Sequence, residues 1–236
     1  MTLTEHLEEL RWCLLRSVIA VLVGSTVCYY FSNAIFAFMV APLRENLQPG
    51  QGLIGTSVTE AFFSEIKVAI AAGVLFTCPY IFYQIWRFIA PGLSGGEKKL
   101  VLPFVTCATL FFLGGAYFCY RVVLPVAFKY FVEQYNTMGV LPAIRIGEYF
   151  TFFFRMVLAF GITFELPVFT FFLVRLGLWN YRLMISSFRY AIIGIFILAA
   201  ILTPTPDVIN QSLLALPMLV LYIASIGVAY IWRRTD

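Results

Sequence analysis

Hydrophobic residues occur in long unbroken runs along this chain, without the short alternating patterns of a soluble protein. Three runs that contain no charged residue cover 17–43, 68–86 and 100–120. Two further runs, 156–174 and 190–232, are each interrupted by one acidic residue, Glu165 and Asp207. A helix needs about 20 mostly apolar residues to cross the roughly 30 Å hydrocarbon core of a bilayer. Each run therefore predicts at least one transmembrane helix.

The last run is too long for a single helix. Residues 203–207 read TPTPD, and two prolines with a charge end a helix and favour a turn. We therefore predict an all-α, polytopic membrane protein with six transmembrane helices in one domain, 1–236. The expected spans are 17–40, 67–88, 99–124, 152–175, 187–203 and 209–231.

The fifth span is expected to be short. Only 14 residues, 190–203, are free of charge and of proline. At 1.5 Å per residue they extend about 21 Å, against a core of about 30 Å. A short hairpin beside longer spans indicates a thinned bilayer or a water-filled recess.

Two connections on one side of the predicted bundle have structure of their own. Ser57 and Glu60 form a capping-box pattern that opens an amphipathic segment leading into the second span. The third span stays apolar through Pro125 to Phe131, and residues 136–142 then turn the chain back. We expect these segments to form a cap outside the bilayer.

Charged residues give the orientation. They make up only 12% of the chain, against about 25% in soluble proteins, and the mean hydropathy is +0.91. The face shared by both termini carries ten of the 16 basic residues: Arg11, Arg16, Arg87, Lys98, Lys99, Arg175, Arg182, Arg189, Arg233 and Arg234. This excess places both termini in the cytoplasm. The net charge of +4 thus reflects membrane orientation, and we expect no nucleic-acid partner.

The residues needed for catalysis are missing. His6 is the only histidine, which excludes His-dependent Ser or Cys catalysis within a span, bis-His haem ligation and an HExxH zinc site. An aspartyl intramembrane protease needs two membrane aspartates, whereas this chain has one at a turn and one at its end. No phosphate-binding glycine loop is present. We expect no enzyme activity, no cofactor and no metal site.

Glu165 lies at the centre of its run, where an ionised carboxylate costs several kcal/mol unless it is hydrated, paired or protonated. A carboxylate at this depth indicates a functional site. It could serve as a polar contact for partner helices or as the coupling site of a proton- or ion-coupled secondary transporter. The structural alternative is a protonated Glu165 bonded to a neighbouring helix.

Few acidic residues face the cytoplasm in this arrangement. They are Glu5, Glu8, Glu9, Glu97 and Asp236. A cationic ligand recognised there by charge has few possible partners. The alternative for Glu8 and Glu9 is that they lie on a solvated face of a helix. The alternative for Glu97 is that it caps a helix. Asp207 either caps the last helix or has a functional role.

Six motifs, in order along the chain, carry a family resemblance. They are HLEELR at 6–11, APL at 41–43, QIWRFIAPGL at 84–93, EKK at 97–99, FGITFELPV at 160–168, and LTPTPD at 202–207 followed by Gln211, Leu214, Ala215, Pro217 and Met218. Their order and spacing resemble those of the TatC family, the receptor subunit of the twin-arginine protein translocase, over essentially the whole chain.

The resemblance implies a concave, glove-like bundle with a short final helical hairpin in the plasma (inner) membrane of a prokaryote. It implies a receptor that binds twin-arginine signal peptides of folded cargo proteins at the cytoplasmic face. TatB-like and TatA-like single-span partners would join it in an oligomeric complex that uses the proton-motive force.

The resemblance also assigns roles to residues. Glu9 and Glu97 match the carboxylates that receive the arginine pair, and Arg11 and Phe88 match other positions of that patch. Glu165 matches the polar residue of the concave membrane face. The second hypothesis, a secondary transporter coupled through Glu165, is weakened because no second intramembrane charge offers a relay.

Overall fold

The computed structural model describes residues 3–47, 51–89, 101–175, 177, 179–202 and 208–232. These residues are almost entirely helical, which confirms the predicted all-α class. Helical stretches long and apolar enough to cross a membrane are Glu5–Tyr30, Glu60–Ile89, Leu102–Thr137, Ile146–Arg175 and Leu214–Ile231. A shorter apolar helix, α8 (Phe188–Leu202), lies where the fifth span was predicted. Together these helices account for the six predicted spans.

Contacts divide the chain into two compact units. The first contains Met1–Ala41, Gly55–Leu110 and Arg145–Phe150. The second contains Pro42–Ile54, Phe111–Ile144 and Thr151–Asp236. The candidate site residues are distributed over both units, so each unit is described separately.

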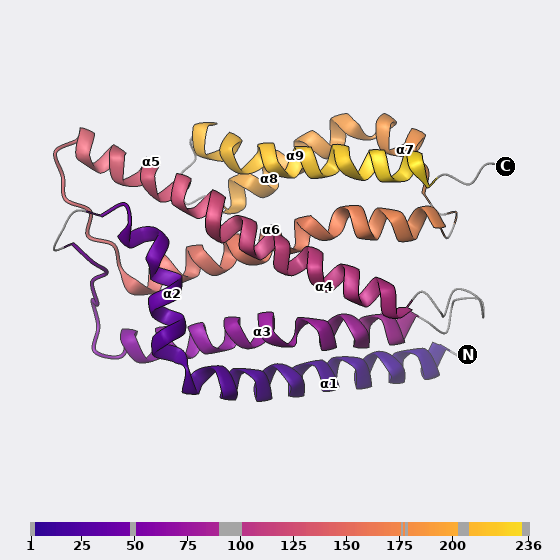
Figure 1. The fold of residues 1–236 in the computed structure, drawn as a ribbon, viewed down its shortest axis with the longest axis horizontal. Coiled ribbons are helices and arrows are strands. Elements are labelled where there is room, and N and C mark those ends of the chain that lie inside the picture. Colours follow the sequence, from indigo (N-terminus) through magenta and orange to yellow (C-terminus); the bar gives the residue numbers. More distant parts are fainter. Residues whose placement is uncertain are drawn as a thin grey trace. The chain divides into compact units, whose positions relative to one another are not determined.

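In the first unit, α1 (Leu3–Tyr30) and α3 (Glu60–Ile89) run antiparallel and side by side (Figure 1). Glycines allow their close approach. A Cβ on Gly24 would lie 3.2 Å from the Gly73 carbonyl oxygen, and a Cβ on Gly73 would lie 2.6 Å from the Ser25 backbone nitrogen. Small residues at such contacts are typical of helix packing in membranes.

The predicted first span, 17–40, covers parts of two helices. The first of these, α1, ends at Tyr30, and α2 (Ser32–Arg44) continues in a different direction (Figure 1). At the change of direction, Ser32 Oγ donates a 2.6 Å hydrogen bond to Glu65 Oε1 on α3. No proline or charged residue marks this point in the sequence, and the contact that coincides with it is to a distant residue.

Polar contacts hold the connections of the first unit together. The Glu60 carboxylate accepts hydrogen bonds from the Thr56 backbone N–H at 2.6 Å and from the Gly147 N–H at 2.9 Å. The Tyr149 hydroxyl donates a 2.6 Å hydrogen bond to the Met39 carbonyl. The start of α3 is thereby linked to the start of α6 (Ile146–Arg175), and α6 is linked to α2.

In the second unit, the end of α4 (Val101–Phe118) continues through a π-helix, η3 (Cys119–Val123), into α5 (Leu124–Thr137). The Leu124 N–H bonds to the Cys119 carbonyl, five residues back. Pro125 follows and has no N–H to donate, which favours the widened turn. The helix passes Phe131, as the apolar pattern predicted.

The last helices of the second unit are α7 (Tyr181–Ser186), α8 and α9 (Val208–Ile231). The Gln211 side chain donates a 2.8 Å hydrogen bond to the Phe196 carbonyl and connects α9 to α8. The Tyr222 hydroxyl donates to the Met184 carbonyl and connects α9 to α7. With 15 residues, α8 is about 22 Å long, which confirms a short final hairpin.

Candidate functional site

The structure describes four of the six residues predicted from the sequence. Glu9 and Arg11 lie on α1 and Phe88 lies on α3, all in the first unit. Glu165 lies on α6 in the second unit. Glu97 and Asp207 lie outside the described residues.

An aromatic pair joins the first turns of α1 to the last turn of α3. The His6 ring stacks on the Phe88 ring, with 4.3 Å between the centroids and 18° between the planes. Because α1 and α3 are antiparallel, the start of one helix meets the end of the other. The predicted site residues on these two helices are thereby brought to the same end of the first unit.

Glu9 lies three residues after His6, so the two side chains share a face of α1. The Glu9 side chain is half-buried, and its Oε2 atom is buried with no hydrogen-bond partner among the residues that the structure describes. Leaving a buried acceptor unsatisfied costs about 1–3 kcal/mol, and more for a charged group. A donor that reaches this oxygen would remove that cost.

Arg11 does not share this face. Residues two apart on a helix do not face each other, so Arg11 and Glu9 point to different sides of α1. The Arg11 side chain is exposed, as is that of Glu8. Arg11 is thus close to Glu9 along α1 but lies outside the face that His6 and Glu9 share. Glu8, next to Glu9, is a solvent-exposed carboxylate.

The end of α3 contacts a different helix on each side. Trp86, which is 4% exposed, packs against Phe104 on α4 with ring centroids 4.0 Å apart. Phe88, two residues later, points to the opposite side of α3 and meets His6 on α1. Anchoring of Trp86 thus holds Phe88 in position beside α1.

His6 is the site residue that sequence reasoning missed. The lone histidine was weighed for catalysis, haem and metal binding and stands in the HLEELR motif, but no contact was predicted for it, and its ring lies against Phe88. Its spacing of three from Glu9 was the available signal. Among the described parts of the chain, no group of three or more His, Cys, Asp or Glu side chains could hold a metal ion.

Glu165 lies beside a close helix crossing in the second unit. A Cβ on Gly115 of α4 would lie 2.7 Å from the backbone carbonyl oxygen of Phe160 on α6, so the two helices nearly touch. Glu165 follows Phe160 on α6 and is half-buried. Its carboxyl group contacts the Phe112 backbone, and its Oε1 atom is buried without a hydrogen-bond partner in the described part of the chain.

Helices of this length and hydropathy define a polytopic all-helical membrane protein. Comparisons with known proteins identify its family. The sequence model of the family described as "Sec-independent protein translocase protein (TatC)" matches residues 5–217 of this chain. The chain therefore belongs to the TatC family, whose members are components of the twin-arginine protein translocase.

Individual relatives agree with this assignment. The TatC protein of Magnetococcus marinus is 44% identical over 226 residues, which cover 95% of this chain and 82% of that protein. TatC of Campylobacter jejuni is 41% identical, with coverage of 95% and 91%. A crystal structure of the twin-arginine translocase receptor TatC has a TM-score of 0.86 at 36% identity, and the match covers 96% of this chain and 99% of that one.

Proposed function

We propose that this chain is the receptor of its translocase and binds paired-arginine signal peptides at the end of the first unit. Glu9 and the His6–Phe88 stack form the described part of this site, Arg11 borders it, and Glu97 supplies a second carboxylate. The observation that carries the proposal is the buried Glu9 Oε2 atom, which has no hydrogen-bond partner within the described residues and belongs to the side chain one helical turn after the stacked His6.

The chemistry of this patch favours arginine. A planar guanidinium donates two parallel hydrogen bonds to a carboxylate and can stack on an aromatic ring such as that of Phe88. A lysine ammonium is a compact, strongly hydrated charge that matches neither geometry as well. A carboxylate at Glu9 and an aromatic ring at Phe88, at the same end of the first unit, thus favour a guanidinium over an ammonium group.

The proposal extends to the assembled translocase. The receptor lies in the inner membrane of a prokaryote with both termini in the cytoplasm, and it moves folded cargo proteins with the proton-motive force. Glu165 contacts TatB-like or TatA-like single-span partners once the peptide is bound. Support comes from the excess of basic residues on one face and from the related chain named a twin-arginine translocase receptor.

Glu9→Gln is expected to weaken binding of a paired-arginine peptide, because it keeps the size of the side chain and removes its charge. A charge-assisted hydrogen bond contributes about 1.5–3 kcal/mol, so the affinity should fall roughly tenfold to hundredfold. The measurement is peptide fluorescence anisotropy with the chain in lipid nanodiscs. Glu8→Gln, the same change at an exposed neighbour, should leave the affinity close to that of the parent.

Equal affinity for the parent and for correctly folded Glu9→Gln would reject this site. An equal loss of peptide affinity in Glu9→Gln and Glu8→Gln would indicate a general effect of negative charge instead of a specific contact at Glu9. Solute transport by the purified chain alone would favour a secondary transporter over a receptor.

A further inference from the structure

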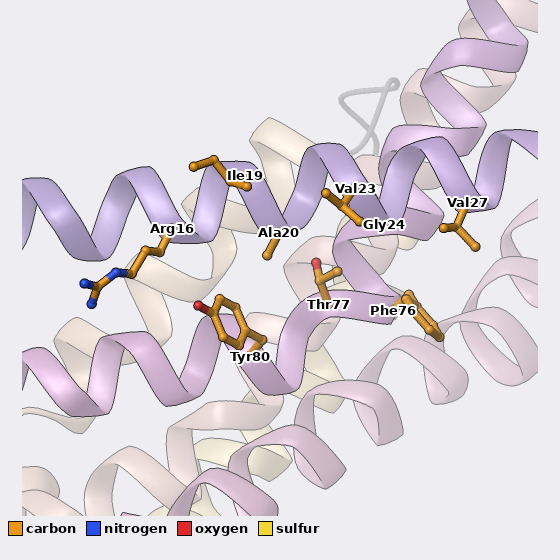
Figure 2. A pocket seen from close by; sticks show the side chains of 9 residues that line it. All are labelled: Arg16, Ile19, Ala20, Val23, Gly24, Val27, Phe76, Thr77 and Tyr80. Atoms are coloured by element: carbon orange, nitrogen blue, oxygen red, sulfur yellow. The ribbon is translucent and has the colours of Figure 1, made fainter.

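An apolar groove lies between α1 and α3, within the first unit (Figure 2). Its volume is about 370 Å³. The small residues Ala20 and Gly24 on α1 leave space that the rings of Phe76 and Tyr80 on α3 border. Phe76 is 70% exposed, so the groove is open to the surroundings of the helix pair.

A cationic side chain lies at one end of this groove. Figure 2 shows Arg16 at that end, with the Tyr80 hydroxyl on the side of its ring nearer to Arg16. The Arg16 guanidinium carbon lies 6.0 Å from the Trp12 ring centroid. No carboxylate lies within ion-pair distance of Arg16 in the described part of the chain. Its charge is therefore available to an anion from outside the protein.

The length of the groove matches one leaflet of a bilayer. From Arg16 to Val27 it follows α1 for eleven residues, or roughly 16 Å. Half of the hydrocarbon core is about 15 Å. A ligand that begins at Arg16 thus ends near the midplane, as an acyl chain does, whereas a partner helix would continue across the whole core.

We infer that the groove binds one acyl chain of an anionic phospholipid, with the lipid phosphate on the Arg16 guanidinium. Guanidinium and phosphate form charge-assisted bidentate pairs. Anionic lipids give the cytoplasmic leaflet its negative surface potential. The inference rests on the cytoplasmic placement of Arg16 in the proposed function and not on the peptide site.

The test compares lipid retention by variants changed at Arg16, where the lipid phosphate would bind, and at Ala20, which lines the groove beside the acyl chain. Each is reconstituted in vesicles with equal amounts of phosphatidylglycerol and phosphatidylcholine, extracted in mild detergent, and analysed by native mass spectrometry. The parent should retain one phosphatidylglycerol in preference to phosphatidylcholine. Arg16→Gln should lower this preference about fivefold, the effect of one basic residue near a membrane surface. Ala20→Leu should lower retention of both lipids.

Arg87→Gln is the matched control, because it removes one exposed charge at the same end of the helix pair without lining the groove. Unchanged preference in Arg16→Gln, or equal loss in Arg87→Gln, would overturn the inference. A disulfide between two copies of a Val23→Cys variant in vesicles would identify a second chain as the occupant and overturn it as well. Peptide affinity should stay at the parent level in Arg16→Gln, which separates this test from that of the receptor site.

Discussion

Replacing Gly73 with leucine is expected to prevent stable pairing of α1 with α3. A Cβ at this position would lie 2.6 Å from the backbone nitrogen and 2.8 Å from the Cα of Ser25. These are backbone atoms, so the clash is relieved only if the helices separate. Overpacking costs about 1–3 kcal/mol for smaller changes, and a whole leucine side chain should exceed that range. Thermal unfolding in detergent should show a large decrease in Tm.

The same substitution should also abolish peptide binding, because Glu9 and Phe88 belong to the two helices that separate. Gly114→Leu is the matched control, since no atom beyond the neighbouring backbone of its own helix lies within 4 Å of a Cβ built there. Leucine is also a better helix former than glycine, so this control should be neutral or stabilising. A Gly73→Leu protein as stable as the parent would refute the close packing of α1 on α3.

Replacing Glu165 with alanine is expected to stop transport while leaving the protein folded and able to bind peptide. Its Oε1 atom has no hydrogen-bond partner among the described residues, and Phe112 lies inside α4, where its backbone groups are bonded along the helix. The Phe112 backbone, which the carboxyl group contacts, keeps its hydrogen bonds within α4 when the carboxylate is removed. A partner that bonds to Glu165 would lose about 1.5–3 kcal/mol, or at least about tenfold in affinity.

Three measurements on Glu165→Ala separate the possible roles. They are thermal stability, affinity for a paired-arginine peptide, and crosslinking to a single-span partner. We expect only the third to fall, together with transport of a folded reporter. Glu148→Ala removes an exposed carboxylate from the start of the same helix and should change none of them. Reduced stability with intact crosslinking would assign Glu165 a structural role.

Most of the fold could be predicted because helix length in a membrane is set by the length of apolar runs. The capping pattern at Ser57 and Glu60 lies where α3 starts, but the helix begins at Glu60, and the Glu60 carboxylate accepts from the Thr56 and Gly147 N–H groups. The end of α1 at Tyr30 could not be predicted, because it coincides with the bond from Ser32 to Glu65, 33 residues away. Contacts of that kind leave no local pattern in the sequence.

The candidate site was predicted only in part, because it too depends on a contact between residues that are distant in the sequence. The motif around Glu9 and the segment that ends at Phe88 are visible in the sequence. The contact between His6 and Phe88 depends on the register of two antiparallel helices, which no local pattern specifies. The role of Glu97 remains a prediction from the family resemblance, and Asp207 remains either a helix cap or a functional residue.

The most direct test of the receptor proposal is a double-mutant cycle between Glu9 and the arginine pair of the peptide. Parent and Glu9→Gln are each titrated with a paired-arginine peptide and with its paired-lysine variant. If Glu9 receives a guanidinium, the parent should prefer arginine by about tenfold or more, and Glu9→Gln should lose most of that preference. The coupling free energy should then be about 1.4 kcal/mol or larger. An equal preference for arginine in both proteins, and thus no coupling, would contradict the proposal.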